Sequence, residues 1–158
     1  MRLIFKQRMF SWLDSYDVYD ERGNVYFRVK GKLSFGHCLE IYDSEGRSCG
    51  TVKEVLFTFL PRFEIYAGGE FIGSISRRLS LWRSKYDIDF LGWQVTGDIW
   101  DWDYQIRDSR GNVRALIYKQ IFHFTDTYVL DVVDTKDVLY VLMFVIAMDA
   151  EKCSDAND

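Results

Sequence analysis

The stretch DVLYVLMFVIAMDA, residues 137–150, decides how the rest of the chain is interpreted. Eleven apolar residues follow one another without a break from Val138 to Met148. A membrane-spanning helix needs about 20 apolar residues, so this run is too short to cross a bilayer. It is long for a single strand and rich in Leu, Met and Ala, which favour helices. A helix that is apolar on every side must be buried on every side. We therefore expect a buried helix from Lys136 to Ala150, with the Asp137 carboxylate at its N-terminal end.

The chain before this helix contains a repeated pattern. Three segments alternate apolar and polar residues and then read Asp-x-x-Gly, and two looser segments end in a shorter glycine turn. Alternation is typical of strands, and Asp followed three residues later by Gly suits a type I turn. Each copy therefore predicts two strands joined by a turn. The copies are YDVYDERGNV (16–25), LEIYDSEGRS (39–48), FEIYAGGEF (63–71), YDIDFLGWQV (86–95) and YQIRDSRGNV (104–113).

Counting the copies gives about twelve strands, because one strand precedes the first copy and LDVVDTKD (130–137) begins a sixth. An eight-stranded barrel is just filled by its own side chains. Twelve strands would leave a hole that an apolar helix, about 10–12 Å across, can fill. The predicted strands are 3–8, 15–20, 25–33, 38–43, 48–56, 62–66, 70–77, 85–90, 93–98, 102–108, 112–121 and 127–133.

The predicted fold is therefore mainly β: a closed antiparallel barrel of about twelve strands around a central hydrophobic C-terminal helix. The first and the twelfth strands are the natural pair to close it. A chain of 158 residues is expected to form one domain. We assign it to residues 1–150 and expect a polar tail at 151–158.

The bulk properties exclude several classes of protein. The net charge of -4 gives no general attraction to nucleic acid. The N-terminal MRLIF is followed at once by polar residues, so we identify no signal peptide. We expect a cytoplasmic protein without a transmembrane segment, peripheral at a membrane if it acts there.

One basic segment, SRRLSLWRSK (76–85), is a candidate contact for an anionic surface. Cations near an anionic bilayer contribute about 1 kcal/mol each, and Trp favours the membrane interface. The alternative is a solvated strand end whose charges keep a sheet in water. The candidate contact residues are Arg77, Arg78, Trp82, Arg83 and Lys85.

No catalytic residue, metal site or cofactor site is predicted. Asp101 and Asp103 are two residues apart, so on a strand they face one side and could act as acid and base. The alternative is a strand whose Asp side chains face outward while Trp100 and Trp102 face inward. We therefore expect a protein that is not an enzyme.

The order and spacing of several motifs resemble the LURP-one-related family. They are FKQRMFSWLDSYDVYDERGNVYFRVKGKL (5–33), EIYDSEG (40–46), VKEVLFTFLPRFEIY (52–66) and the apolar C-terminal segment. The likeness is closest to small stand-alone bacterial members. It implies the fold of the tubby C-terminal domain and the phospholipid scramblases, a twelve-stranded barrel around a hydrophobic helix.

The resemblance supplies no site residues. Scramblases have an acidic stretch, thought to bind calcium, before the final helix, and Asp131, Asp134 and Asp137 stand in that place. These aspartates lack the spacing, central Gly and closing Glu of an EF-hand loop, which argues against calcium.

Three hypotheses on function follow. The first is a non-enzymatic binding or scaffold barrel, with an anionic phospholipid surface or a protein as candidate partner. The second is a carrier that binds a small hydrophobic ligand inside the barrel, which requires an interior not filled by the helix. The third is a cryptic hydrolase that uses Asp101 and Asp103.

Overall fold

The computed structural model describes residues 1–6, 15–32, 34–78, 85–99, 101–122 and 125–155. These residues form twelve strands, a 3-10 turn η1 (Thr135–Asp137) and the helix α1 (Val138–Asp155). The strands are β1 (Arg2–Lys6), β2 (Ser15–Asp20), β3 (Val25–Gly31), β4 (Cys38–Asp43), β5 (Ser48–Glu54), β6 (Arg62–Ala67), β7 (Glu70–Arg78), β8 (Lys85–Ile88), β9 (Gln94–Asp98), β10 (Asp103–Arg107), β11 (Val113–Phe122) and β12 (Thr125–Val132).

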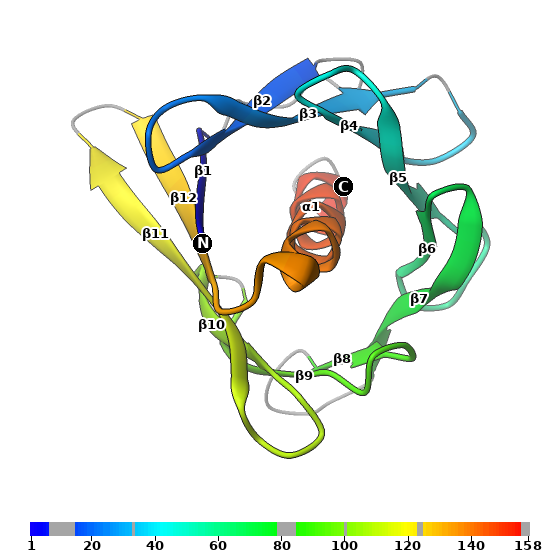
Figure 1. The fold of residues 1–158 in the computed structure, drawn as a ribbon. Helices are drawn as coiled ribbons and strands as arrows, with labels where there is room; N and C mark the ends of the chain where they lie inside the picture. Colours follow the sequence, from blue (N-terminus) through cyan, green and yellow to red (C-terminus); the bar gives the residue numbers. More distant parts are fainter. Residues whose placement is uncertain (7–14, 33, 79–84, 100, 123–124, 156–158) are drawn as a thin grey trace.

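The strands form one antiparallel sheet that curls around α1 (Figure 1). Its order is β8-β7-β6-β5-β4-β3-β2-β1-β12-β11-β10-β9. Strands that pair in the sheet are therefore consecutive in sequence, except where β1 joins β12. That pair runs from Arg2 opposite Asp131 to Lys6 opposite Thr127. The predicted mainly-β barrel around a C-terminal helix is confirmed, and so is the pairing of its first and twelfth strands.

The predicted Asp-x-x-Gly turns account for three of the hairpins. In the first, the Gly23 amide donates to the Asp20 carbonyl over 3.0 Å, and the Asn24 amide donates to Asp20 Oδ1 over 2.8 Å. Gly23 has a φ of 83°, a conformation that glycine adopts without steric cost. The same bonds recur at Asp43 and Asp108. Local turn chemistry therefore sets the register of these hairpins.

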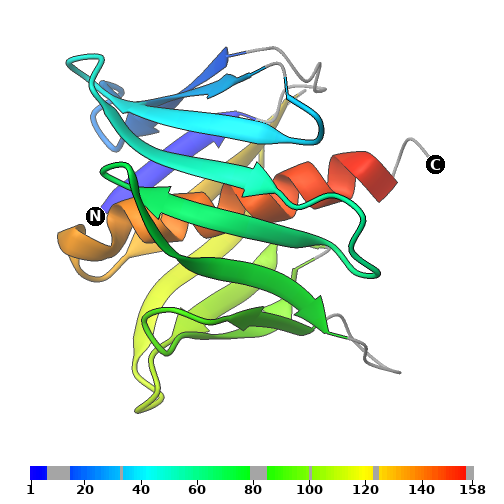
Figure 2. The same ribbon diagram turned by 90° about the vertical axis from the view of Figure 1, so that its right-hand side faces the viewer.

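The helix α1 runs along the inside of the barrel (Figure 2). Residues 141–150 are all buried, and Leu142, Phe144, Val145 and Ile146 are nearly inaccessible to solvent, as predicted. The inward faces of the strands complete the core with alternate apolar residues. At Gly50 on β5 an added Cβ would lie 1.9 Å from Met143 Cε, so the buried Met143 side chain would have to move.

Both ends of the helix differ from the sequence prediction. Asp134, rather than Asp137, caps the start: its Oδ1 accepts from the Lys136 amide over 3.1 Å. Asp137 is buried and its Oδ2 accepts from Arg114 Nε over 2.8 Å. The predicted end at Ala150 is wrong, since the helix continues through residues that were expected to form a polar tail, as far as Asp155. The barrel gives two of those polar residues partners that a sequence pattern does not reveal: Glu151 pairs with Arg77, and Lys152 lies over the Trp102 ring.

The sheet is nearly closed, with a seam between β8 and β9 where the ladder is interrupted. The segment 86–95 was predicted as a hairpin, and this is wrong, because its two strands are the opposite edges of the sheet. The connection instead turns Phe90 and Trp93 inward, where both rings lie beside Tyr140 of α1, at centroid distances of 6.3 and 6.5 Å. At the seam, aromatic side chains that pack on α1 take the place of backbone hydrogen bonds between strands.

Candidate functional site

The two ends of the barrel differ in chemistry. One end, here called the turn end, carries the three Asp-x-x-Gly turns and the start of α1. The other, the loop end, carries the β3–β4 loop, the β5–β6 loop and the last turn of α1 (Figure 2). Three of the candidate basic residues lie at the loop end: Arg77 and Arg78 are the last residues of β7, and Lys85 is the first of β8.

The structure places two of those basic side chains in ion pairs. Arg77 Nη1 lies 3.2 Å from Glu151 Oε1 at the end of α1, and Arg78 pairs with Asp87 on β8. Lys85 begins β8. Trp82 and Arg83 lie outside the described residues. Arg77 therefore helps to hold the end of α1, while Arg78, although paired, remains exposed.

Neighbouring strands add cations that sequence reasoning missed. Lys53 near the end of β5 and Arg62 at the start of β6 are both exposed. Arg77 and Arg78 follow on β7, and the Arg77 amide donates to the Pro61 carbonyl over 3.0 Å. The four strands β5 to β8 thus each place a basic residue at the same end of the sheet. Pairing between the strands brings these basic residues together, and that pairing is not visible in a linear sequence.

Two loops of the loop end are joined to each other. The Glu54 amide donates to the His37 carbonyl over 2.7 Å, and the His37 amide donates back to Glu54 Oε2 over 2.9 Å. Gly36 packs so closely on Leu56 that an added Cβ would lie 2.8 Å from Leu56 Cδ2. The β3–β4 and β5–β6 loops therefore form one surface, adjacent to β7.

Three phenylalanines project from these loops. The exposed fractions are 92% for Phe35, 104% for Phe57 and 90% for Phe59. Among the described residues, the next most exposed large apolar side chain is Val133, at 67%. Phenylalanine is usually buried, so three exposed rings on adjoining loops mark a surface rather than a scatter of single residues.

A polar cluster lies inside the barrel near the loop end. Asp149 of α1 is buried, and its Oδ1 has no hydrogen-bond partner within the part of the chain that the structure describes; the same is true of the buried Tyr104 hydroxyl. Burial raises the pKa of Asp149 to about 7 and lowers the pKa of Lys152 to about 8. Lys152 Nζ lies 4.2 Å from the centroid of the Trp102 ring. The raised pKa of Asp149 makes the contribution of this carboxyl group to stability depend on pH.

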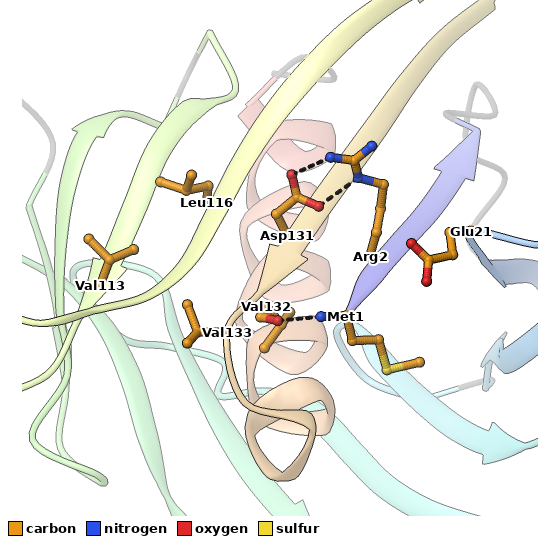
Figure 3. A pocket seen from close by; sticks show the side chains of 8 residues that line it. All are labelled: Met1, Arg2, Glu21, Val113, Leu116, Asp131, Val132 and Val133. Atoms are coloured by element: carbon orange, nitrogen blue, oxygen red, sulfur yellow. Dashed lines mark hydrogen bonds and ion pairs between the residues drawn. The ribbon is translucent and has the colours of Figure 1, made fainter.

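A shallow hollow of about 380 Å³ lies on the outer wall, where β11, β12 and β1 meet the β2–β3 turn (Figure 3). Arg2 Nε and Nη2 donate to the Asp131 carboxylate over 2.6 and 2.9 Å, and the Tyr118 hydroxyl donates to it over 3.0 Å. The Met1 amine donates to the Val132 carbonyl over 2.6 Å. The polar groups around this hollow thus form hydrogen bonds mainly to one another. The lining residues are Met1, Arg2, Glu21, Val113, Leu116, Asp131, Val132 and Val133.

A second hollow of about 450 Å³ adjoins the first, because both are lined by the exposed Leu116. Cross-strand register places Thr96, Gln105, Leu116, Asp131 and Arg2 in one row across five strands. No sequence motif predicted this surface, since its residues come from distant segments.

The carboxylates considered at the sequence level have separate structural roles. Asp101 lies in the β9–β10 turn rather than on a strand, where its amide donates to Asp98 Oδ1 over 3.1 Å, whereas Asp103 begins β10. Trp102 faces inward as expected; Trp100 lies outside the described residues. Asp131 binds Arg2, and Asp137 binds Arg114. Within the described ranges no three metal-binding side chains come together.

Burial sets the protonation states of two other side chains, His37 and Cys49. Burial lowers the pKa of His37 to about 4 and raises the pKa of Cys49 to about 11. Near neutral pH the imidazole is therefore uncharged and the thiol protonated. In the described part of the chain, no helix has the length and apolarity needed to cross a membrane.

Comparisons with known proteins agree with this fold. A family model described as LURP-one-related matches residues 1–149. The uncharacterized protein YxjI of Bacillus subtilis (strain 168) is 30% identical over 159 residues, covering 100% of this chain and 98% of that protein. An X-ray structure of a protein from Arabidopsis thaliana matches with a TM-score of 0.61 and 14% identity, covering 94% of this chain and 91% of that one. At that identity the likeness supports the fold alone.

Proposed function

Because the chain belongs to the LURP-one-related family, a family of barrels without an assigned activity, we propose that it is a non-enzymatic binding barrel that attaches to anionic phospholipid surfaces. The attachment uses the loop end. The proposal includes a cytoplasmic location with peripheral, reversible contact at the membrane.

The observation that carries this proposal is the row of cations at the ends of four neighbouring strands. Lys53, Arg62 and Arg78 are exposed at the loop end, and Lys85 begins the adjacent strand. Each cation near an anionic bilayer contributes about 1 kcal/mol. Arg78 shares its charge with Asp87, so we assign the main electrostatic contribution to Lys53 and Arg62.

The location of α1 favours an exterior site over the carrier hypothesis. A ligand carrier needs free space along the barrel axis, and residues 141–150 occupy that space with buried side chains. The hydrolase hypothesis receives no support from the geometry, since Asp101 lies in a turn and Asp103 is exposed on a strand. Binding at the outer surface is therefore the function that the arrangement supports best.

The test is co-sedimentation of the purified protein with vesicles of phosphatidylcholine, with and without phosphatidylserine. We expect binding only to the anionic vesicles, and weaker binding at high salt, because the screening length falls from about 10 Å at 0.1 M to about 3 Å at 1 M. Lys53→Gln and Arg62→Gln should each weaken binding by about 1 kcal/mol, or about fivefold.

The matched controls are Arg22→Gln and Arg110→Gln, which neutralise exposed cations in the polar turns at the turn end. They should leave vesicle binding unchanged. Equal losses for the two pairs of variants would mean that net charge, and not the loop end, governs the contact. The proposal is contradicted if the wild-type protein fails to bind every anionic vesicle tested.

A further inference from the structure

The exposed phenylalanines of the loop end are presented in a fixed way. Phe57 has a φ of 60°, a left-handed conformation that is unusual for a bulky side chain. The loop around it is held by the Thr58 hydroxyl, which donates to the Val55 carbonyl over 3.2 Å, and by the Val55 amide, which donates to the Arg62 carbonyl over 2.9 Å. The backbone is thus constrained in a conformation that directs an apolar ring into solvent.

The turn end provides an internal comparison. Its most comparable ring is Phe71 on β7, which is 55% exposed and packs on Tyr66 at a centroid distance of 5.6 Å. The neighbouring hairpin turns are rich in charged residues, such as Arg22 and Glu45. Full exposure of phenylalanine is therefore confined, among the described residues, to one end of the molecule.

The shape and charge of the loop end fit a bilayer. Three separate rings that project from loop tips suit a partner that can flow around them, as acyl chains and headgroups do. Lys53 and Arg62 flank the β5–β6 loop, at the ends of the strands that it joins, and complement anionic headgroups. Apolar side chains combined with neighbouring cations are the features by which peripheral segments bind the interface.

We propose that Phe35, Phe57 and Phe59 insert into the interfacial region of an anionic bilayer. The barrel then stands with its loop end toward the membrane and its turn end toward solvent. This inference rests on the proposed function and adds an apolar contribution that salt does not screen. Lys53 and Arg62 lie at headgroup level while the rings lie deeper.

The experiment compares Phe35→Ser, Phe57→Ser and Phe59→Ser, singly and together, with Phe71→Ser as the matched control. Binding to phosphatidylcholine/phosphatidylserine vesicles is measured by co-sedimentation at low and at high salt. Because these rings have little contact with the core, we expect thermal unfolding to stay within a few degrees of wild type. Each loop substitution should lower the partition coefficient about fivefold to tenfold, since partial burial recovers part of the value for a buried Phe.

The outcomes separate this inference from the proposed function. If the rings insert, the part of the vesicle binding that survives at high salt should disappear in the triple variant. It should persist in Phe71→Ser. If the loop variants bind like wild type while Lys53→Gln and Arg62→Gln reduce binding, insertion is wrong and surface attachment stands. If wild type binds no vesicle, both are wrong, and the exposed rings serve a protein partner instead.

Discussion

Asp149 offers a direct test of how the buried helix contributes to stability. Its carboxyl group is 2% exposed, and burial raises its pKa from 3.8 to about 7. Between about pH 4 and pH 7 this carboxyl group therefore binds more protons in the folded protein than in the unfolded chain, so its contribution to stability falls as the pH rises. The difference of about three pKa units corresponds to about 4 kcal/mol, at 1.36 kcal/mol per unit. The nearby Lys152 charge opposes the shift but does not cancel it.

Asp149→Asn removes the charge and keeps the shape. We expect the free energy of unfolding of the variant, relative to wild type, to increase by up to about 4 kcal/mol between pH 4 and pH 8. The assay is urea unfolding followed by tryptophan fluorescence at several pH values. Asp101→Asn, at an exposed turn of the same end, is the control and should stay within about 0.5 kcal/mol of wild type throughout.

A difference in the free energy of unfolding between Asp149→Asn and wild type that stays constant over this pH range would contradict the raised pKa of Asp149. A constant difference would mean that Asp149 is ionised and well solvated in the folded protein.

Two further substitutions test the packing of α1 against the wall. Leu142→Ala should lower the free energy of unfolding by about 2–5 kcal/mol, the range for a large-to-small change in a packed core; Leu116→Ala at an exposed position is the control, and equal costs would contradict the buried helix. Gly50→Ala should cost about 1–3 kcal/mol by overpacking against Met143. Combining it with Met143→Ala should cost less than the sum of the two, and strict additivity in urea unfolding would show that the residues do not touch.

Local chemistry explains which parts of the fold could be predicted from the sequence. The Asp20, Asp43 and Asp108 turns were predictable because each aspartate bonds amides within four residues of itself. The helix was predictable because its run of apolar residues is longer than a single strand usually is. The end of the helix was not, because Glu151 is stabilised inside the barrel by Arg77, a residue 74 positions away.

The candidate site was predicted only in part. Arg77 and Arg78 were found from a linear cluster, but their carboxylate partners come from other elements. The exposed rings were missed because phenylalanine in a sequence predicts burial. The signal that could have found them is VLFTFLPRF (55–63), where two phenylalanines stand between predicted strands beside Pro61.

The seam between β8 and β9 bears on how such a barrel can be assembled. The helix follows all twelve strands in the sequence. β1 pairs with β12, whose residues lie more than a hundred positions later. A cylinder with a complete ladder would have to admit the helix through one end. A sheet with two free edges can instead wrap around the helix from the side. At the seam between those edges, Phe90 and Trp93 contact Tyr140 of the helix. Distant pairing of this kind makes folding slow, and the two edge strands at the seam allow the sheet to enclose the helix without threading it through one end.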